Sequence, residues 1–237
     1  MNMKRLNDAA WHLHRACNTL GKNRAKYGLF GDFAITVRGK SKIENYSTEY
    51  KGYLECLARE KKQRMINVLD YREGFRLRYH VINLQESFCE FTWSDTEDRK
   101  DEITLKVYCD PVFGWPEEAD MLTEPYHVQG HRKSGQVHFL EPIHLLKGRI
   151  REAAMEFKHE HGADIYFLAT EYDSHIRPHA RALNLTYVGL VLKHHAYLEP
   201  LFTNLGLDIT EAKRKAGLRR ANIIGDEPRN VWHNLLF

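Results

Sequence analysis

Apolar residues recur along the first 20 positions at the spacing of a helix with one buried face. They fall at Ala9, Ala10, Leu13, Cys17 and Leu20. This spacing predicts an amphipathic helix over 7–20. Gly21 follows at the position where helices commonly end in a left-handed residue.

The segment Tyr27–Ser47, YGLFGDFAITVRGKSKIENYS, contains two glycines between short apolar stretches. It predicts a strand, a turn at Gly31, a helix over 32–38, a second turn at Gly39 and an exposed strand over 42–47. Each piece is too short to bury itself. We therefore expect the rest of a sheet to be built on this segment.

A helix is expected over 49–68, because Tyr53, Leu54, Leu57 and Ala58 form one apolar stripe opposite a Lys/Arg-rich face. Period-2 alternation predicts strands over 75–84, 87–93 and 103–109. The stretch 94–102, SDTEDRKDE, has no apolar residue, which predicts a loop exposed to solvent. Frequent proline and glycine over 110–141 predict ordered loops around a strand at 136–140, lining or covering a cleft.

Helix-forming residues dominate from Pro142 onward, with Pro142 at a suitable first helical position. A helix ending near Gly162 and a second helix over 164–174 are expected, followed by shorter helices. The predicted fold is α/β (α+β), with a small mixed sheet flanked by helices over 1–140. A helical unit over 141–237 is expected to pack on it.

Composition is typical of a globular protein that forms a core: 237 residues, 43% hydrophobic and 28% charged. The net charge of +3 is small for a nucleic-acid-binding surface, and the basic runs 59–64 and 213–220 predict solvated helix faces. The four cysteines form no CxxC pair, which favours neither a zinc site nor a disulfide framework. Without a signal-peptide pattern or a membrane-length apolar run, the expected location is cytoplasmic, with no membrane contact.

The order of the predicted elements resembles that of the nucleotidyltransferase superfamily, the polymerase-beta-like fold. The resemblance is carried by the strand and glycine turn at Gly31, the helix and strand after it, a later strand followed by Asp110, and the segment LEPIHLLKGRIREAAMEFKHEHGADIYFL. It implies a mixed sheet under a cleft. It also implies two Mg²⁺ ions held by two aspartates at i and i+2 and by a third carboxylate.

The chain departs from this family pattern at the metal ligands. Gly31-Asp32 stands where Gly-Gly or Gly-Ser is usual, and the strand over 42–47 offers Glu44 and Tyr46 in place of two aspartates. A tyrosine, with an ordinary pKa of about 10, is a poor Mg²⁺ ligand. No metal-binding residues are therefore assigned.

The candidate catalytic residues are Asp32, Glu44, Tyr46 and Asp110, which the inferred fold turns toward one cleft. Asp32 also suits the N-cap of the helix that follows it. The candidate substrate-binding residues are glycine or aromatic, and they are Gly31, Tyr79, Tyr108, Phe113, Trp115 and Tyr126. Such a pocket suits a carbon-rich ligand better than a triphosphate.

These features predict a nucleotidyltransferase-type scaffold that binds a small apolar organic molecule. It would transform this molecule by acid/base chemistry without a metal or cofactor, as a cyclase or isomerase of a specialised pathway. One alternative is an active nucleotidyltransferase that uses Glu44 and Asp110 with Mg²⁺ and a nucleoside triphosphate. The other is a non-catalytic module that binds RNA or a protein through the basic runs. GxSxG, P-loop and GxGxxG motifs are absent.

Overall fold

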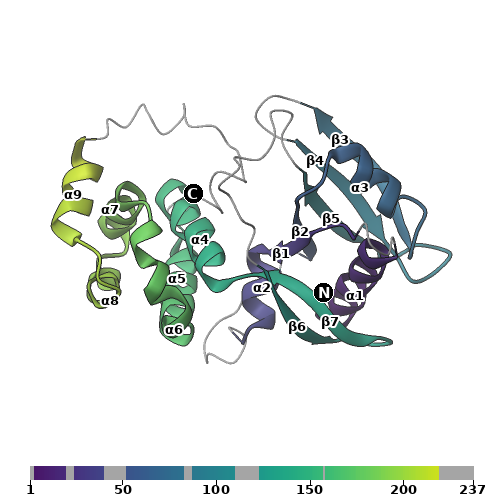
Figure 1. The fold of residues 1–237 in the computed structure, drawn as a ribbon, viewed down its shortest axis with the longest axis horizontal. Coiled ribbons are helices and arrows are strands. Elements are labelled where there is room, and N and C mark those ends of the chain that lie inside the picture. Colours follow the sequence, from purple (N-terminus) through teal and green to yellow (C-terminus); the bar gives the residue numbers. More distant parts are fainter. Residues whose placement is uncertain are drawn as a thin grey trace. The chain divides into compact units, whose positions relative to one another are not determined.

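The computed structural model describes residues 3–19, 24–39, 52–82, 87–109, 123–156 and 158–218. Contacts divide the chain into two compact units, Met1–Leu140 (unit 1) and Glu141–Phe237 (unit 2). Unit 1 contains a seven-stranded sheet with helices, and the described part of unit 2 is helical (Figure 1). Within the described ranges, no helix combines the length and the apolar character needed to cross a membrane.

Unit 1 has a mixed sheet, as predicted. Its helices are α1 (Met3–Asn18), α2 (Gly31–Val37) and α3 (Lys62–Leu69), and its strands are β1 (Tyr27–Phe30), β2 (Tyr53–Ala58), β3 (Phe75–Ile82), β4 (Ser87–Trp93), β5 (Ile103–Tyr108), β6 (Thr123–Gln129) and β7 (Ser134–Leu140). The strand order is β3-β4-β5-β2-β1-β7-β6. The pairs β2–β5 and β1–β7 are parallel and the other pairs are antiparallel.

The two faces of the sheet differ in polarity, and β5 shows the difference most clearly. Ile103, Leu105 and Val107 are buried, whereas the residues that alternate with them are half-buried. Helices α1 and α3 contact the strands on the apolar side, where Trp93 and Phe91 are also buried. We call the opposite side, which carries Thr104, Lys106 and Tyr108, the polar face.

Residues 53–58 form a strand, so the helix predicted over 49–68 is wrong in its first half. Strand β2 lies between β1 and β5, and its backbone pairs with both. Leu57 and Ala58 point to opposite faces, and both are fully buried. The last three residues of β2 are buried on both faces, so the alternation is lost there and the apolar positions also fit a helical stripe. Backbone pairing with β1 and β5 makes residues 53–58 a strand. Of the predicted helix, only the part that corresponds to α3 is helical.

Strands β6 and β7 form a hairpin of which the sequence predicted only the second strand. The β7 strand begins at Ser134 and includes the predicted stretch 136–140. In β6 only Val128 is buried, so no clear alternation marks it as a strand. Pro125 also argues against a central strand, but β6 lies at the sheet edge, where a missing N–H is tolerated.

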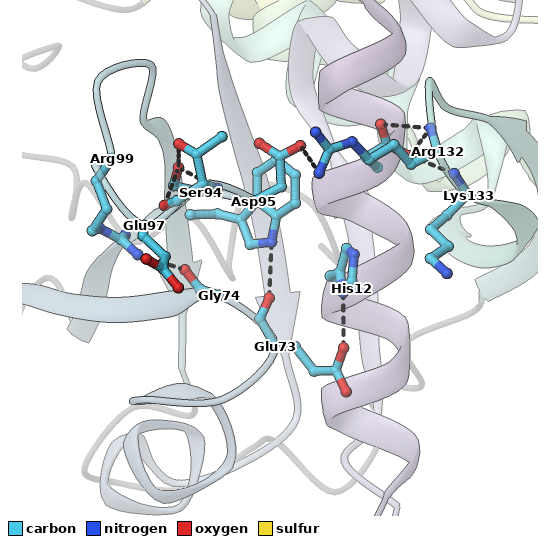
Figure 2. A pocket seen from close by; sticks show the side chains of 12 residues that line it. His12, Glu73, Gly74, Ser94, Asp95, Glu97, Arg99, Arg132 and Lys133 are labelled. Atoms are coloured by element: carbon cyan, nitrogen blue, oxygen red, sulfur yellow. Dashed lines mark hydrogen bonds and ion pairs between the residues drawn. The ribbon is translucent and has the colours of Figure 1, made fainter.

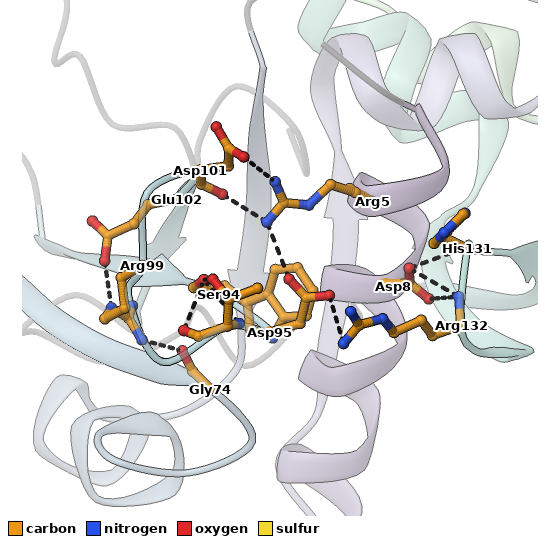
Figure 3. A network of polar contacts seen from close by, with 12 residues as sticks. Arg5, Asp8, Gly74, Ser94, Asp95, Arg99, Asp101, Glu102, His131 and Arg132 are labelled. Carbon is orange, nitrogen blue, oxygen red and sulfur yellow. Dashed lines mark hydrogen bonds and ion pairs between the residues drawn. The ribbon is translucent and has the colours of Figure 1, made fainter.

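Asp8 connects α1 to the turn of this hairpin (Figure 3). Its carboxylate, 2% exposed, accepts hydrogen bonds from the backbone N–H groups of His131, Arg132 and Lys133 at 2.8 to 3.2 Å. Asp95, in the loop after β4, binds the guanidinium of Arg132 at 3.1 Å. The same carboxylate group lies 3.1 Å from the guanidinium of Arg5 on α1. These contacts hold three separate parts of unit 1 together.

A second polar cluster joins α1 to β1 and β7. The rings of His14 and His138 are stacked with centroids 5.4 Å apart. His14 Nδ1 lies 2.9 Å from the Tyr27 hydroxyl, and His14 Nε2 lies 2.7 Å from Asn18 Nδ2. Burial is the main cause that lowers the pKa of both histidines, and nearby Arg24 lowers it further.

We expect this pair to make the free energy of unfolding fall as the pH drops below about 6.5, the ordinary pKa of histidine. Because folding lowers both pKa values, the unfolded chain takes up more protons in this range, and acid favours it. Above about pH 6.5 both states are neutral and the contribution is constant. Urea unfolding between about pH 5.5 and about pH 7.5 measures the slope. The slope should be smaller in His14→Gln/His138→Gln, and an equal slope in this variant would contradict the prediction.

The described part of unit 2 is entirely helical, as predicted. Its elements are α4 (Pro142–Glu156), α5 (His159–Glu171), α6 (Asp173–Ile176), the 3₁₀ helix η3 (Arg177–Ala182), α7 (Leu185–His194), the 3₁₀ helix η4 (Ala196–Leu198), α8 (Glu199–Asn204) and α9 (Ile209–Leu218). Pro142 is the first residue of α4, as expected. Gly162 lies inside α5, so the prediction of a helix that ends near it is wrong. A Cβ there would lie 2.6 Å from His195 Nδ1 and 2.3 Å from the Tyr197 hydroxyl, which explains why the position is glycine.

Arg149 connects α4 to α5 through a buried ion pair. Its Nε lies 3.1 Å from Asp164 Oδ2, and the two side chains are 5% and 2% exposed. Its Nη1 donates to Glu152 at 2.7 Å and lies 3.0 Å from His161 Nδ1. The guanidinium is therefore held from several directions inside unit 2.

Candidate functional site

The polar face of the sheet carries charged residues that meet in register. Glu55 of β2 pairs with Lys106 of β5, and Lys106 pairs with Glu90 of β4. Tyr79 of β3 pairs with Glu90 and continues the series. Directly paired residues of neighbouring strands project to the same face. We call Glu55, Lys106, Glu90 and Tyr79 the charged row.

Glu55 lies against the glycine turn between β1 and α2. Phe30 is its partner on β1, and Gly31 follows with a φ of +71°. A Cβ at Gly31 would lie 2.1 Å from Glu55 Oε2, so the carboxylate occupies space that only glycine leaves open. Tyr53, two residues before Glu55 on the same strand, projects to the same face.

Gly31→Ala is expected to displace the Glu55 carboxylate and to lower the free energy of unfolding by about 1–2 kcal/mol, the cost of a left-handed residue with a side chain. The carboxylate is the end of a flexible side chain, so it moves while the sheet stays intact. Urea unfolding in the wild-type and Glu55→Ala backgrounds measures the coupling between the two positions.

Gly39→Ala is the matched control. Gly39 has a φ of +118°, and no residue of the described ranges lies within 4 Å of an added Cβ. This variant therefore introduces backbone strain without contacting Glu55, and its coupling to Glu55→Ala should be near zero. Equal coupling for the two glycines would contradict the proposed contact.

In the charged row, Glu90 is a carboxylate held in place by its neighbours, and Lys106 is the cation. Glu90, whose side chain is 6% exposed, lies 3.2 Å from Arg78 and accepts a hydrogen bond from the Tyr79 hydroxyl at 2.8 Å. This hydrogen bond is the main cause that raises the pKa of Tyr79. The ammonium of Lys106 lies 5.1 Å from the ring centroid of Tyr53. The row therefore offers an ammonium in register with two carboxylates.

Four aromatic rings follow one another on this face. Tyr79 and Phe88 have ring centroids 6.0 Å apart, and Phe88 and Tyr108 are 5.7 Å apart. Phe30 of β1 completes the series, 5.6 Å from Tyr108. We call Tyr79, Phe88, Tyr108 and Phe30 the aromatic row. It gives the charged row an apolar border that includes two of the predicted substrate-binding residues.

No protein-family model matches the sequence, and no curated protein is significantly similar to it. In the described ranges, His, Cys, Asp and Glu side chains form no group of three or more arranged to hold a metal ion.

Of the predicted catalytic residues, Asp32 is the one within the described ranges. It is half-buried in the first turn of α2. The helix begins at Gly31 and its N-cap is Phe30, so the N-cap prediction for Asp32 is wrong. A carboxylate in the first turn still interacts favourably with the helix dipole. Glu44, Tyr46, Asp110, Phe113 and Trp115 lie outside the described residues, as does the predicted strand over 42–47.

Tyr126 takes a different position from Tyr79 and Tyr108. Its hydroxyl donates to the carbonyl of Val37 at 3.2 Å, and its ring lies edge-on to Phe139 at 5.4 Å. The guanidinium of Arg38 lies 5.6 Å from the ring centroid. Tyr126 thus supports the end of α2, whereas Tyr79 and Tyr108 belong to the aromatic row.

The sequence reasoning missed Glu55 and Lys106. Glu55 was missed because a helix was expected over 49–68. Residues at i and i+2, such as Tyr53 and Glu55, project to the same face in a strand but not in a helix. The spacing of Tyr53 and Glu55 in the sequence YLECLA is the feature from which Glu55 could have been predicted to lie on the same face as Tyr53. Lys106 belongs to a correctly predicted strand, but only the strand order places it beside Glu55.

The basic runs are partly neutralised by neighbouring acids. Arg64 pairs with Glu60 at 3.2 Å. In α9, Lys213 pairs with Glu199 at 2.7 Å, and Glu211 binds both Arg214 and Lys215. Local pairing of this kind does not favour a nucleic-acid-binding surface.

Proposed function

We propose that unit 1 is a nucleotidyltransferase-type scaffold that binds a small organic molecule over the charged and aromatic rows. It converts this molecule by acid/base chemistry without a metal ion, as a cyclase or isomerase does. The order of elements supports the scaffold: β1 and the Gly31 turn lead through α2 to β2, and β5 lies next to β2. The family resemblance also implies a strand over 42–47 directly after this helix, and that stretch lies outside the described residues.

The observation that carries the proposal is the position of Lys106 between Glu55 and Glu90. A two-metal site needs several carboxylates around its ions. An ammonium in register with Glu55 repels a divalent cation from the same space, and it attracts an anionic group of a ligand. Glu55 can then give or take a proton at the bound molecule.

The aromatic row indicates the shape of the ligand. Phe88 and Tyr108 offer ring surface beside the charged row. A planar molecule stacks favourably on such rings. We therefore assign a planar organic acid to the site, with its anionic group toward Lys106 and its carbon skeleton toward the aromatic row.

Calorimetric titration with ATP or CTP, with and without Mg²⁺, tests the proposal against the active nucleotidyltransferase that would use Glu44 and Asp110. We expect no Mg²⁺-dependent binding. Tight Mg²⁺-dependent binding of either nucleotide, together with pyrophosphate release, would overturn the proposal.

Ligand-observed NMR with benzoates, cinnamates and enolisable 2-oxo acids supplies the direct test. We expect a saturable complex that Lys106→Met weakens about tenfold, because a charge-assisted contact is lost. Lys100→Met is the matched control, since this exposed lysine lies in a loop, 3.3 Å from Asp98. For a probe that is converted, Glu55→Gln should slow conversion by about 10²–10⁴-fold, and a chelator should leave it unchanged. Equal binding by wild type and Lys106→Met would contradict the assignment.

A further inference from the structure

A separate pocket of about 460 Å³ lies in unit 1 beside α1 (Figure 2). Its walls come from α1, the turn before β3, the loop after β4 and the turn between β6 and β7. Trp93, which is almost fully buried, contributes to the lining. The charged row contributes no residue, so the pocket is independent of the proposed function.

The His12 imidazole is fixed in this pocket through one of its two ring nitrogens. His12 Nδ1 lies 2.8 Å from Glu73 Oε2. The His12 ring lies edge-on to Trp11, with centroids 4.9 Å apart, and 5.5 Å from the ring of Trp93. A carboxylate at Nδ1 places the proton of the neutral imidazole there and leaves Nε2 as an acceptor. In Figure 2 this nitrogen is directed away from Glu73, and no group of the described ranges hydrogen-bonds to it.

The turn that supplies Glu73 has an unfavourable backbone conformation. Glu73 has a φ of +49°, and Tyr71, two residues earlier, has a φ of +57°. Non-glycine residues rarely adopt this left-handed region, because the Cβ atom crowds the following carbonyl oxygen. The Trp93 Nε1–H donates to the Glu73 carbonyl at 2.9 Å, and the Arg15 guanidinium lies 3.3 Å from Glu73 Oε1. These contacts hold the strained turn with its carboxylate toward His12.

Arg99, in the loop after β4, shows the same strain and also lines the pocket. Its φ is +49°, and its guanidinium donates to the carbonyls of Gly74 at 3.0 Å and Thr92 at 3.1 Å. Three non-glycine residues of the described ranges have a positive φ, and two of them line this pocket. Strained residues of this kind cluster at ligand-binding and active sites. The strain therefore indicates a functional pocket and not only a gap between loops.

Most charged groups in the pocket wall are already compensated. The Asp8 carboxylate accepts three backbone hydrogen bonds, and the Asp95 carboxylate lies 3.1 Å from each of two guanidinium groups. The Lys133 ammonium lies 5.5 Å from the ring centroid of Trp11. A net charge on a ligand therefore gains little here. The group that the wall leaves open is the neutral acceptor at His12 Nε2.

We propose that this pocket binds a neutral phenol or indole, whose hydroxyl or ring N–H donates a hydrogen bond to His12 Nε2. Glu73 is a positioning residue, because its carboxylate selects the tautomer of His12 that accepts this hydrogen bond. The pocket lies in the lower part of the range of roughly 300–1,000 Å³ for small-molecule sites, which suits a molecule of one or two rings. The rings of His12 and Trp93 in the lining favour an aromatic ligand.

Matched pairs of neutral probes test the hydrogen bond in the full chain. Phenol, 2-naphthol and indole are compared with anisole, 2-methoxynaphthalene and N-methylindole, at about pH 8, where an ordinary histidine is neutral. Heteronuclear NMR of the histidine rings follows each titration, and the His12 signal is identified by its loss in His12→Phe. We expect at least one donor probe to shift this signal saturably and to bind about five- to tenfold more tightly than its methylated counterpart.

Variants locate the complex and separate it from the charged row. His12→Phe should abolish the preference for the donor probe, measured by ligand-observed NMR. His127→Phe, at an exposed histidine of β6 outside the lining, is the matched control and should keep the preference. Lys106→Met should leave the binding unchanged. Loss of binding in Lys106→Met would assign the probe to the charged row and overturn the proposal for this pocket.

Glu73→Gln tests the role of the carboxylate. The amide N–H can donate to His12 Nδ1, which makes the tautomer with a proton on Nε2 accessible, so the preference for the donor probe should shrink at least about twofold. Glu97→Gln changes another acid of the lining and should keep the full preference. Thermal melting checks that both variants are folded. The proposal is overturned if no donor probe shifts the His12 signal, if the methylated counterparts bind equally well, or if folded Glu73→Gln keeps the full preference.

Discussion

Asp164→Ala is expected to lower the free energy of unfolding of unit 2 by about 3–5 kcal/mol. The Arg149 guanidinium is 5% exposed and lies 3.1 Å from Asp164. Removing the carboxylate takes away the buried partner of a buried positive charge, and leaves Glu152, whose side chain is 46% exposed, at the Arg149 Nη1. Urea unfolding followed by far-UV circular dichroism measures the loss.

Two comparison variants separate burial from pairing. Asp173→Ala breaks an ion pair with Arg177 at 2.7 Å whose side chains are 40% and 52% exposed, and it should cost less than about 1 kcal/mol. Arg149→Met/Asp164→Leu replaces both buried charges with apolar groups and should recover most of the stability. The explanation fails if Asp164→Ala costs no more than Asp173→Ala.

Asp8→Ala is expected to lower the free energy of unfolding of unit 1 by about 2–4 kcal/mol. The Asp8 carboxylate accepts hydrogen bonds from three successive N–H groups, and bonds to a charged acceptor contribute about 1.5–3 kcal/mol each. Water replaces part of this contribution in the variant, because the turn itself is exposed. The β6–β7 turn should also lose its fixed position on α1.

Amide hydrogen exchange gives this prediction a local readout. The N–H groups of His131, Arg132 and Lys133 should exchange faster in Asp8→Ala, while those in the middle of β7 keep their protection relative to global unfolding. Asp98→Ala serves as the control, because its carboxylate accepts a hydrogen bond from Thr96 within an exposed loop. Unchanged exchange at the three turn residues in Asp8→Ala would contradict the role assigned to Asp8.

The candidate site was predictable only in part, and its two most informative residues show why. Tyr79 and Tyr108 follow from strands whose alternation is clear in the sequence. Glu55 lies on a strand that is buried on both faces near its end, so its local pattern does not distinguish strand from helix. Lys106 is 51 positions further along the chain, and only the parallel pairing of β2 with β5 brings the two together.

The sequence by itself determined the elements that bury one side and expose the other: α1, β5, α4, and the turn at Gly31 between β1 and α2. The spacing of their apolar residues shows which side of each element faces the core and which faces water, and this spacing can be read from the local sequence. The tertiary structure alone decided the identity of β2, the edge position of β6 and the meeting of Glu55 with Lys106. Those features depend on hydrogen bonds between strands far apart in sequence, and a local pattern carries no information about which strands become neighbours.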